Sequence, residues 1–130
     1  MKILITGADG QAGSELQQTA PKGVELVAVD IDRLNIVESQ EVDEYVKSVG
    51  PSLIVNTAAY TAVDRAEEDS DAAYAVNSNG AANLARAANA IGARLIHIST
   101  DFVFDGLKSS PYLPLDEPNP LGVYGASKLA

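Results

Sequence analysis

The chain has no cysteine and a single histidine among its 130 residues. It therefore has no disulfide framework or thiol nucleophile, and it offers few of the side chains that hold transition metals. We accordingly expect no metal site. Aromatic residues are also scarce, at 5% of the sequence, whereas 46% of the residues are hydrophobic and 21% are charged. That balance is typical of a globular protein, and the length suits one domain with a buried core.

Positively charged residues are also few: the chain has 9 Lys and Arg residues but 18 Asp and Glu residues, which gives a formal net charge of -9. Nucleic acids and anionic membranes would be repelled by such a chain, so we expect neither as a partner. Long apolar runs are missing too. Met1 and Lys2 lead into a run too short for a signal peptide, and no stretch approaches membrane-spanning length, which favours a cytoplasmic location.

Short apolar runs alternate with helical patterns, an order typical of parallel βαβ units. Strands are predicted at 2–6, 25–30, 53–56 and 94–99, and helices at 11–19, 39–49, 70–91 and from about 121. Ser39 and Ser70 are expected N-caps, and Gly92 is expected to end the long helix. The sequence thus predicts an α/β fold with a Rossmann-like doubly wound parallel sheet. With right-handed crossovers we expect the strand order 3-2-1-4.

A glycine-rich segment joins the first predicted strand to the first predicted helix. Gly7, Gly10 and Gly13 follow the pattern G-x-x-G-x-x-G, in the context that a dinucleotide-binding fingerprint requires. The first glycine permits a tight turn, the second lets the backbone approach a pyrophosphate, and the third permits close helix–strand packing. Backbone dipoles at the helix N-terminus would hold such an anion without a basic patch. A plain glycine turn is the less favoured alternative.

An acidic residue, Asp30, closes the second predicted strand. A carboxylate there can accept hydrogen bonds from the adenosine ribose hydroxyls and would repel a 2′-phosphate, which favours NADH. Arg33 lies close by and could instead meet that phosphate, and an acidic turn without a ligand is the other alternative. The sequence therefore predicts NADH or NADPH as the cofactor, with a lean toward NADH.

The next two strand ends carry further candidates. Asn56–Thr61 holds mainly small side chains against which a cofactor could lie, although a tightly packed strand end is equally expected. Thr100 and Asp101 end the fourth strand, where a hydroxyl could hydrogen-bond a substrate carbonyl, but such residues more often form turns or caps. His97 is predicted to be a packed strand residue, neither a base nor a metal ligand.

Two asparagines, Asn77 and Asn79, interrupt the long predicted helix, although asparagine is a poor helix former. Their side chains could contact neighbouring loops or lie on an exposed face. The residues alone favour neither alternative.

Tyr124 and Lys128 stand four residues apart in the last predicted helix, so they share one face of it. A nearby cation favours phenolate, and the pair therefore suits proton transfer near neutral pH. The Y-x-x-x-K spacing alone is common on exposed helices. Combined with the glycine loop, it indicates an oxidoreductase.

Four segments together make the chain resemble the extended short-chain dehydrogenase/reductases, and within them the dTDP-4-dehydrorhamnose reductase family. They are Gly-Ala-Asp-Gly-Gln-Ala-Gly from Gly7, Asn-Thr-Ala-Ala-Tyr-Thr-Ala-Val-Asp from Asn56, Ser-Thr-Asp-Phe-Val-Phe-Asp-Gly from Ser99 and Pro-Leu-Gly-Val-Tyr-Gly-Ala-Ser-Lys-Leu-Ala from Pro120. The resemblance covers essentially the whole chain, and the second and third segments point to the reductases.

The resemblance implies reduction of the C4 ketone of dTDP-4-dehydro-L-rhamnose to dTDP-L-rhamnose by hydride from NAD(P)H, in nucleotide-sugar and cell-surface polysaccharide biosynthesis. It implies that Tyr124 donates the proton, that Lys128 favours its phenolate, and that Thr100 orients the carbonyl. Asp101 would face the substrate. The implied cofactor contacts are Gly7, Gly10, Gln11, Ala12, Gly13, Asp30, Ala59, Tyr60, Thr61, Tyr124 and Lys128. Asn35 and Ile36 stand where the family usually has an acid and an apolar residue near the adenine.

Members of this family continue well beyond the lysine into a small substrate domain. We therefore expect residues 1–130 to be a partial NAD(P)-binding Rossmann domain, truncated after the Tyr-x-x-x-Lys segment and without turnover by itself. A homo-oligomer or another protein could cover the sheet face left open.

Two rival functions share the same features. A sugar-nucleotide epimerase or dehydratase has the glycine loop and the Tyr–Lys pair, although Phe102 stands where the resemblance places an acid in dehydratases. A non-catalytic regulatory subunit, like the beta subunit of methionine adenosyltransferase, shares the fold. The presence of Thr100, Tyr124 and Lys128 favours an enzyme.

Overall fold

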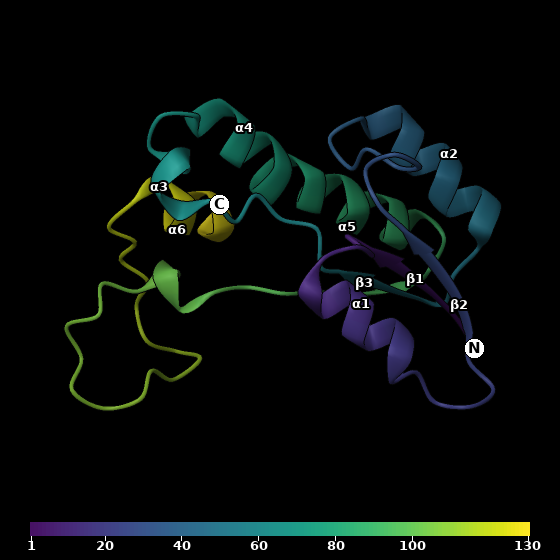
Figure 1. Cartoon of the computed structure of the whole chain (residues 1–130), viewed down its shortest axis with the longest axis horizontal. Helices are drawn as coiled ribbons and strands as arrows, with labels where there is room; N and C mark the ends of the chain where they lie inside the picture. The colour runs from purple at the N-terminus through teal and green to yellow at the C-terminus, as the bar shows by residue number, and fades with distance from the viewer.

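The computed structural model describes residues 1–130 as a four-stranded parallel sheet with helices on both faces (Figure 1). The strands are β1 (Lys2–Thr6), β2 (Glu25–Val29), β3 (Leu53–Asn56) and β4 (Arg94–His97). The helices are α1 (Gln11–Gln18), α2 (Ser39–Val49), α3 (Val63–Ala66), α4 (Ser70–Tyr74), α5 (Ala81–Ala90) and α6 (Val123–Leu129), with a π-helix, η1 (Ala75–Gly80), and a 3-10 helix, η2 (Asp101–Val103). The predicted α/β class and Rossmann-like parallel sheet are confirmed.

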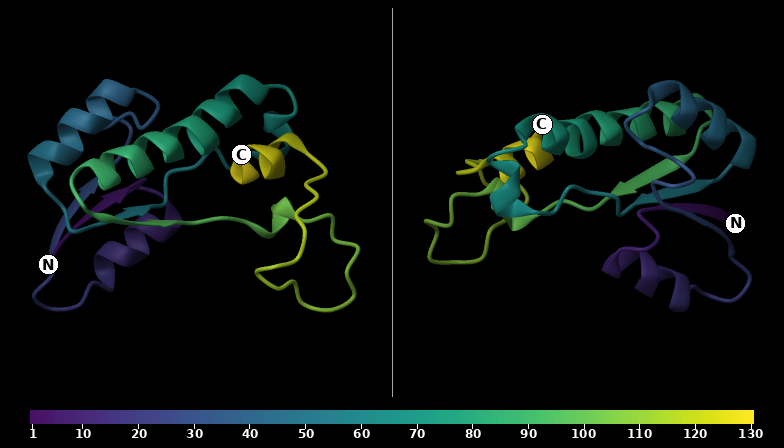
Figure 2. Two further views of the ribbon diagram at one scale, coloured as in Figure 1. Left: turned by 180° about the vertical axis from the view of Figure 1, so that it is seen from behind. Right: turned by 45° about the horizontal axis from the view of Figure 1, so that its top comes forward.

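The strand order is β2-β1-β3-β4, so the expected order 3-2-1-4 is wrong. β3 pairs with β1, with Ile54 level with Leu4, instead of lying outside β2. The chain moves from β1 out to β2 and then back across β1 to β3. With right-handed crossovers this reversal puts α2 on the sheet face opposite α1, as Figure 2 shows. The physical reason is burial: β3 ends in three buried residues, which suits a central strand, whereas β2 begins at an exposed glutamate.

The hydrophobic core lies between the sheet and the helices α2 and α5. Leu4, Val42, Val46, Ile54 and Leu84 have no exposed surface there. Each such side chain contributes roughly 1.5–3 kcal/mol through its burial. On the other face α1 packs near β2 and leaves Ile96 and Ile98 about half exposed, at 49% and 48%. No helix has both the length and the apolar character needed to cross a membrane.

The ends of two helices differ from the prediction. The N-cap of α2 is Glu38 and that of α4 is Asp69, so Ser39 and Ser70 are not the caps. The Ser39 hydroxyl instead accepts a hydrogen bond from Arg86 Nη2 at 2.9 Å, which ties α2 to α5. Gly92 does end the long helix in the left-handed conformation, with φ of 72°.

The long helix predicted for 70–91 is three consecutive segments, α4, η1 and α5 (Figure 1). The middle segment has the wider π turn, and π turns are frequent at functional sites. α6 packs against α3, α4 and η1, at one end of the molecule. This arrangement brings the last helix beside the carboxyl ends of β3 and β4.

Candidate functional site

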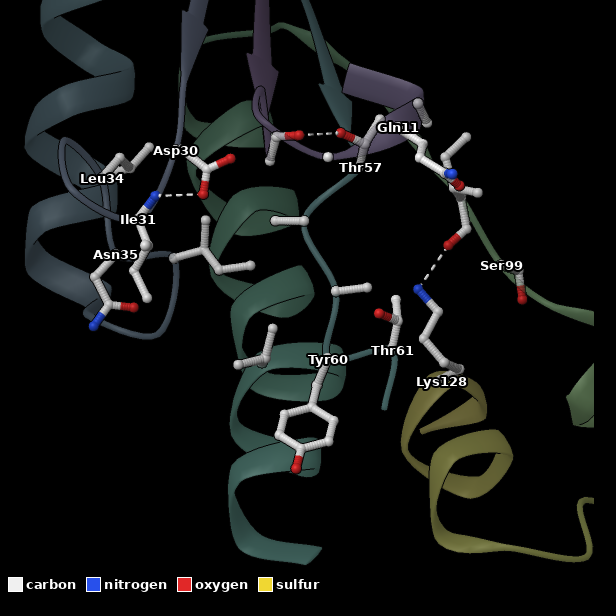
Figure 3. A pocket seen from close by; sticks show the side chains of 18 of the residues that line it. Gln11, Asp30, Ile31, Leu34, Asn35, Thr57, Tyr60, Thr61, Ser99 and Lys128 are labelled. Carbon is white, nitrogen blue, oxygen red and sulfur yellow. Dashed lines mark hydrogen bonds between the residues drawn. The ribbon is translucent and has the colours of Figure 1, made fainter. Parts of the chain in front are cut away.

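A cavity of about 760 Å³ opens at the carboxyl ends of the strands, where β1 meets β3. The chain adds β2 on one side of β1 and β3 on the other, so the strand order reverses at that point, which is where open α/β sheets bind ligands. Figure 3 shows Asp30 and Lys128 on opposite sides of it. Ten of the implied cofactor residues line it, namely Gly7, Gly10, Gln11, Ala12, Asp30, Ala59, Tyr60, Thr61, Tyr124 and Lys128.

Three implied site residues lie outside this lining. Gly13 is the buried residue of α1, and a Cβ there would stand 2.2 Å from the Gly7 carbonyl oxygen, so Gly13 serves the packing of the helix against the loop. The Thr100 hydroxyl accepts a hydrogen bond from the Phe102 amide at 3.2 Å and thereby caps η2. Asp101 lines a separate hollow beside Phe102. The catalytic role of Thr100 and the substrate contact of Asp101 stay predictions.

The glycine loop lies directly against the end of β3. Gly7 has φ of 73°, and a Cβ there would stand 2.5 Å from the Ala58 nitrogen. Thr57 Oγ1 donates to the carbonyl oxygens of Thr6 at 2.7 Å and Gly7 at 3.0 Å. At Gly10 a Cβ would meet only the Gly7 oxygen, at 3.4 Å. The loop therefore has a close-packed base and an open crest, a shape that fits the pyrophosphate of a dinucleotide.

Asp30 forms the cavity wall at the end of β2. Its Oδ2 accepts a hydrogen bond from the Asp9 amide at 2.8 Å, and its Oδ1 accepts one from the Ile31 amide at 2.8 Å (Figure 3). The carboxylate is thus fixed in place, and each oxygen keeps a lone pair for a further donor. The residue can accept from a ribose hydroxyl without rearrangement.

Asn77 connects the segment after β3, at Tyr60, with helix α6, at Ser127. It is 2% exposed, and its Oδ1 accepts from the Tyr60 amide at 2.8 Å. Its Nδ2 donates to the Tyr60 carbonyl at 3.1 Å and to Ser127 Oγ at 2.9 Å. Asn79, two residues on, is exposed. The contact with neighbouring segments therefore holds for Asn77, and the exposed face for Asn79.

We expect Asn77→Leu to lower the free energy of unfolding by about 2–4 kcal/mol, because it leaves the Tyr60 amide and carbonyl without partners in a buried place. Urea denaturation followed by circular dichroism measures the change. Asn79→Leu is the matched control and should change stability by about 0.5 kcal/mol or less. Equal losses in the two variants would contradict the role given to Asn77.

Tyr60 carries a buried hydroxyl that has no hydrogen-bond partner within the chain. Such a group costs about 1–3 kcal/mol. We therefore expect Tyr60→Phe to raise the free energy of unfolding by about 1 kcal/mol, measured by thermal denaturation. Tyr74→Phe changes an exposed ring and should have little effect. A destabilised Tyr60→Phe variant would show that the hydroxyl has a partner.

Tyr124 and Lys128 reach the cavity from α6. The Tyr124 ring meets Phe102 edge-on, with centroids 5.5 Å apart and planes at 73°. Lys128 is only 9% exposed, and its Nζ donates to the Ile98 carbonyl at 2.7 Å and lies 3.3 Å from His97 Nε2. Burial lowers the pKa of Lys128. Burial, and then the charge of Lys128, lower the pKa of His97.

The cavity also has walls that the residue patterns did not indicate. Ile31, Leu34, Val76 and Ile98 add apolar surface to it, and Asn35 and Ile36 line it at the positions where the resemblance places the adenine. Ile31 is 72% exposed, and the sequence signal for it is an isoleucine between two acidic residues, Asp30 and Asp32, directly after the predicted strand. Val76 belongs to the π turn, for which the sequence has no signal.

Comparison with known proteins identifies the family. Residues 1–130 match the family model described as RmlD substrate binding domain. The chain belongs to this family. The dTDP-4-dehydrorhamnose reductase of Burkholderia thailandensis is 44% identical to it over 129 residues, which are 99% of this chain and 43% of that protein. This chain of the RmlD family thus spans less than half the length of the curated relative that it matches.

Solved structures of dTDP-4-dehydrorhamnose reductases agree with this assignment. The dTDP-4-dehydrorhamnose reductase ortholog of Clostridium acetobutylicum matches with a TM-score of 0.97 and 46% identity, over 99% of this chain and 46% of that one. The Bacillus anthracis enzyme, solved in complex with NADP, matches with a TM-score of 0.96 and 40% identity, over 98% of this chain and 46% of that one. The resemblance to the dTDP-4-dehydrorhamnose reductases is confirmed, and neither rival function is favoured.

Proposed function

We propose that residues 1–130 form the NAD(P)-binding Rossmann part of a dTDP-4-dehydrorhamnose reductase, without its C-terminal substrate domain. The complete enzyme reduces the C4 ketone of dTDP-4-dehydro-L-rhamnose to dTDP-L-rhamnose. One observation carries the proposal: the glycine loop, Asp30 and the Tyr124–Lys128 pair, far apart in the sequence, line one cavity. The high similarity to reductases over the whole chain supports it.

The residues along the cavity suit the parts of a dinucleotide in order. Backbone amides of Gly10, Gln11 and Ala12, at the start of α1, would hold the pyrophosphate. Asp30 would accept from the adenosine ribose, and Lys128 would donate to the nicotinamide ribose across the cavity. Ala59, Tyr60 and Thr61 would lie along the cofactor between them. The bound nicotinamide supplies the hydride for the reduction.

Tyr124 is the proton donor in this proposal. As the C4 carbonyl gains negative charge, its oxygen takes the phenolic proton, and the product is an alcohol. Lys128 in its ammonium form lies one helical turn away and stabilises the phenolate left behind. Thr100, once its hydroxyl turns from Asp101, would hydrogen-bond the same carbonyl oxygen and hold it near Tyr124, with Asp101 facing the sugar.

NADH is the cofactor we propose, because the fixed Asp30 carboxylate would repel a 2′-phosphate. Arg33, three residues after Asp30, is exposed, and its positive charge could attract a 2′-phosphate and so offset that repulsion. NADPH therefore stays the competing cofactor, in line with the NADP complex of the Bacillus anthracis relative. Binding constants for both dinucleotides, with Asp30→Asn as a variant, measure the preference.

A cytoplasmic location follows from the proposed reaction, since nucleotide sugars and NADH are cytoplasmic metabolites. The partner is the nucleotide sugar. Self-association is also part of the proposal, because Ile96, about half exposed on β4, leaves apolar surface that a second copy could cover.

The direct assay follows NADH and NADPH oxidation by the complete protein that carries these residues, with dTDP-4-dehydro-L-rhamnose as substrate. We expect stoichiometric formation of dTDP-L-rhamnose. Interconversion of nucleotide sugars without net cofactor consumption would favour the epimerase alternative instead. Activation of a methionine adenosyltransferase, without any turnover of the sugar, would favour the regulatory subunit.

A further inference from the structure

A line of polar side chains crosses the carboxyl end of the sheet and ends at Lys128. Thr6 on β1 and Asn56 on β3 meet at 2.8 Å between Oγ1 and Oδ1. Asn56 Nδ2 lies 3.0 Å from Nδ1 of His97 on β4. His97 Nε2 lies 3.3 Å from Lys128 Nζ on α6. Thr6 and Asn56 are each 1% exposed, so the line is built into the sheet rather than laid on its surface.

The direction of hydrogen bonding along this line is determined by one backbone group. The Ala58 amide donates to Asn56 Oδ1 at 3.0 Å, and a backbone N–H can only donate, so Oδ1 is the acceptor and Nδ2 faces His97. Because Nδ2 can only donate, His97 Nδ1 carries the lone pair. The neutral imidazole then has its hydrogen on Nε2. Turning the ring over would place carbon atoms opposite both Asn56 and Lys128.

This tautomer places an N–H opposite the Lys128 nitrogen. An ammonium group has three donors and no acceptor, whereas a neutral amine has a lone pair that can receive the Nε2 hydrogen. The same nitrogen also donates to the Ile98 carbonyl at 2.7 Å. A neutral amine therefore satisfies both contacts, while an ammonium would face another donor at 3.3 Å.

No carboxylate offsets this preference. The three ion pairs of the structure lie elsewhere, at Lys2, Arg86 and Lys108. The titratable side chain within hydrogen-bond distance of Lys128 is His97 on β4, and Tyr124 stands one turn earlier on α6. The elements packed against α6 carry Asp64 on α3, Asp71 on α4 and Asp101 on η2, and none of these carboxylates forms an ion pair with Lys128. Burial favours the neutral amine as well, because it lowers the pKa of Lys128.

We propose that His97 is a positioning residue for Lys128. Asn56 holds the His97 ring with its hydrogen on Nε2. That hydrogen binds the neutral amine of Lys128 beside β4 but repels the ammonium form, which therefore moves toward the cavity. Proton uptake by Lys128 is thereby coupled to its movement toward Tyr124 and the ligand. The catalytic consequence rests on the proposed function. The hydrogen-bond direction does not.

The single histidine of the chain makes the tautomer directly measurable. Long-range proton–nitrogen NMR of the 130-residue chain reports which ring nitrogen carries hydrogen, with no assignment ambiguity. We expect the Nε2–H form near neutral pH. We also expect the pKa of His97 to lie below the ordinary histidine value, so that the ring is still neutral when the pH falls to that ordinary value. An Nδ1–H form, or fast averaging of the two forms, would overturn the proposal.

Asn56→Asp tests the cause. The carboxylate places an acceptor opposite Nδ1, so we expect the hydrogen to move to Nδ1, Nε2 to accept from the Lys128 ammonium, and the pKa of His97 to rise. Asn79→Asp adds the same charge at an exposed position and should leave the tautomer unchanged. If Asn56→Asp does not fold, Lys128→Met serves instead: the Nε2–H form should persist, because Asn56 determines it, and its loss would overturn the proposal.

A functional readout separates positioning from simple packing. In the complete protein, His97→Gln is expected to shift the pH profile of kcat by more than half a pH unit, with the KM for dinucleotide within about threefold of the parent. Loss of folded protein with an unshifted profile would indicate a packing role and contradict the proposal. Absence of any reductase activity would refute the proposed function and leave the NMR result standing.

Discussion

Replacing Gly13 with alanine is expected to lower the free energy of unfolding by at least about 3 kcal/mol, with a fall in the melting temperature of roughly 10 °C. The added Cβ would stand 2.2 Å from the Gly7 carbonyl oxygen and 2.9 Å from the Ala8 Cα. Both neighbours are backbone atoms, so no side chain can turn aside to make room. α1 must move away from Gly7 and Ala8, which distorts the glycine loop. Differential scanning calorimetry measures the loss.

Gly10→Ala is the matched control for this prediction. It adds the same methyl group to the same loop, but its Cβ would meet only the Gly7 oxygen, at 3.4 Å, and its φ of -72° suits any residue. We expect a melting temperature close to that of the parent chain and weaker dinucleotide binding, since the methyl group occupies the loop crest. If both variants lost the same stability, Gly13 would not be the packing residue of the loop.

Tyr124→Phe is expected to lower kcat of the complete protein by about 10²–10⁴-fold, the usual contribution of a positioned proton donor. The KM for dinucleotide should change little, because the phenylalanine ring keeps the edge-on contact with Phe102. Steady-state kinetics with dTDP-4-dehydro-L-rhamnose, combined with a melting curve, separates lost chemistry from lost structure.

Tyr74→Phe provides the comparison, since Tyr74 is an exposed tyrosine that does not line the cavity. It should retain the parent kcat. A Tyr124→Phe variant that kept more than about a third of the parent kcat would contradict the role of proton donor, because general acid catalysis contributes far more than that.

The strands and most helices of this fold were predictable because their signals are local. Apolar runs between turn residues located β1 and β3, and the bounds of α2 were predicted without error at Ser39–Val49. Strand order was not predictable, because it depends on which strand ends up buried on both sides. β2 and β3 both have apolar residues throughout their centres, so the sequence alone did not show that β3 joins β1.

The predictions of the helix N-caps were wrong for a related reason. Serine at a helix start predicts a cap, but Ser39 lies within reach of Arg86 on α5, and this tertiary contact uses its hydroxyl. No short-range pattern contains that information.

The candidate site was predictable where its residues carry a motif. Gly7, Asp30, Tyr124 and Lys128 converge on one cavity, as their positions at strand ends and on the last helix suggested. The connections between motifs were not predictable. Asn77 reaches Tyr60 and Ser127 from a π turn, and His97 meets Lys128 because β4 and α6 come together in space.

The most direct test of the central claim, that this cavity binds a nicotinamide dinucleotide, is an NMR titration of the isotope-labelled chain with NADH, since this method also detects weak binding. The account predicts saturable shifts of the Gly7, Gly10, Gln11 and Ile31 amides, with those of the remote Gly23 and Gly106 unchanged. NADPH should give the same map at higher concentration. A folded chain with no shifts at millimolar NADH, or with shifts scattered away from the cavity, would contradict it.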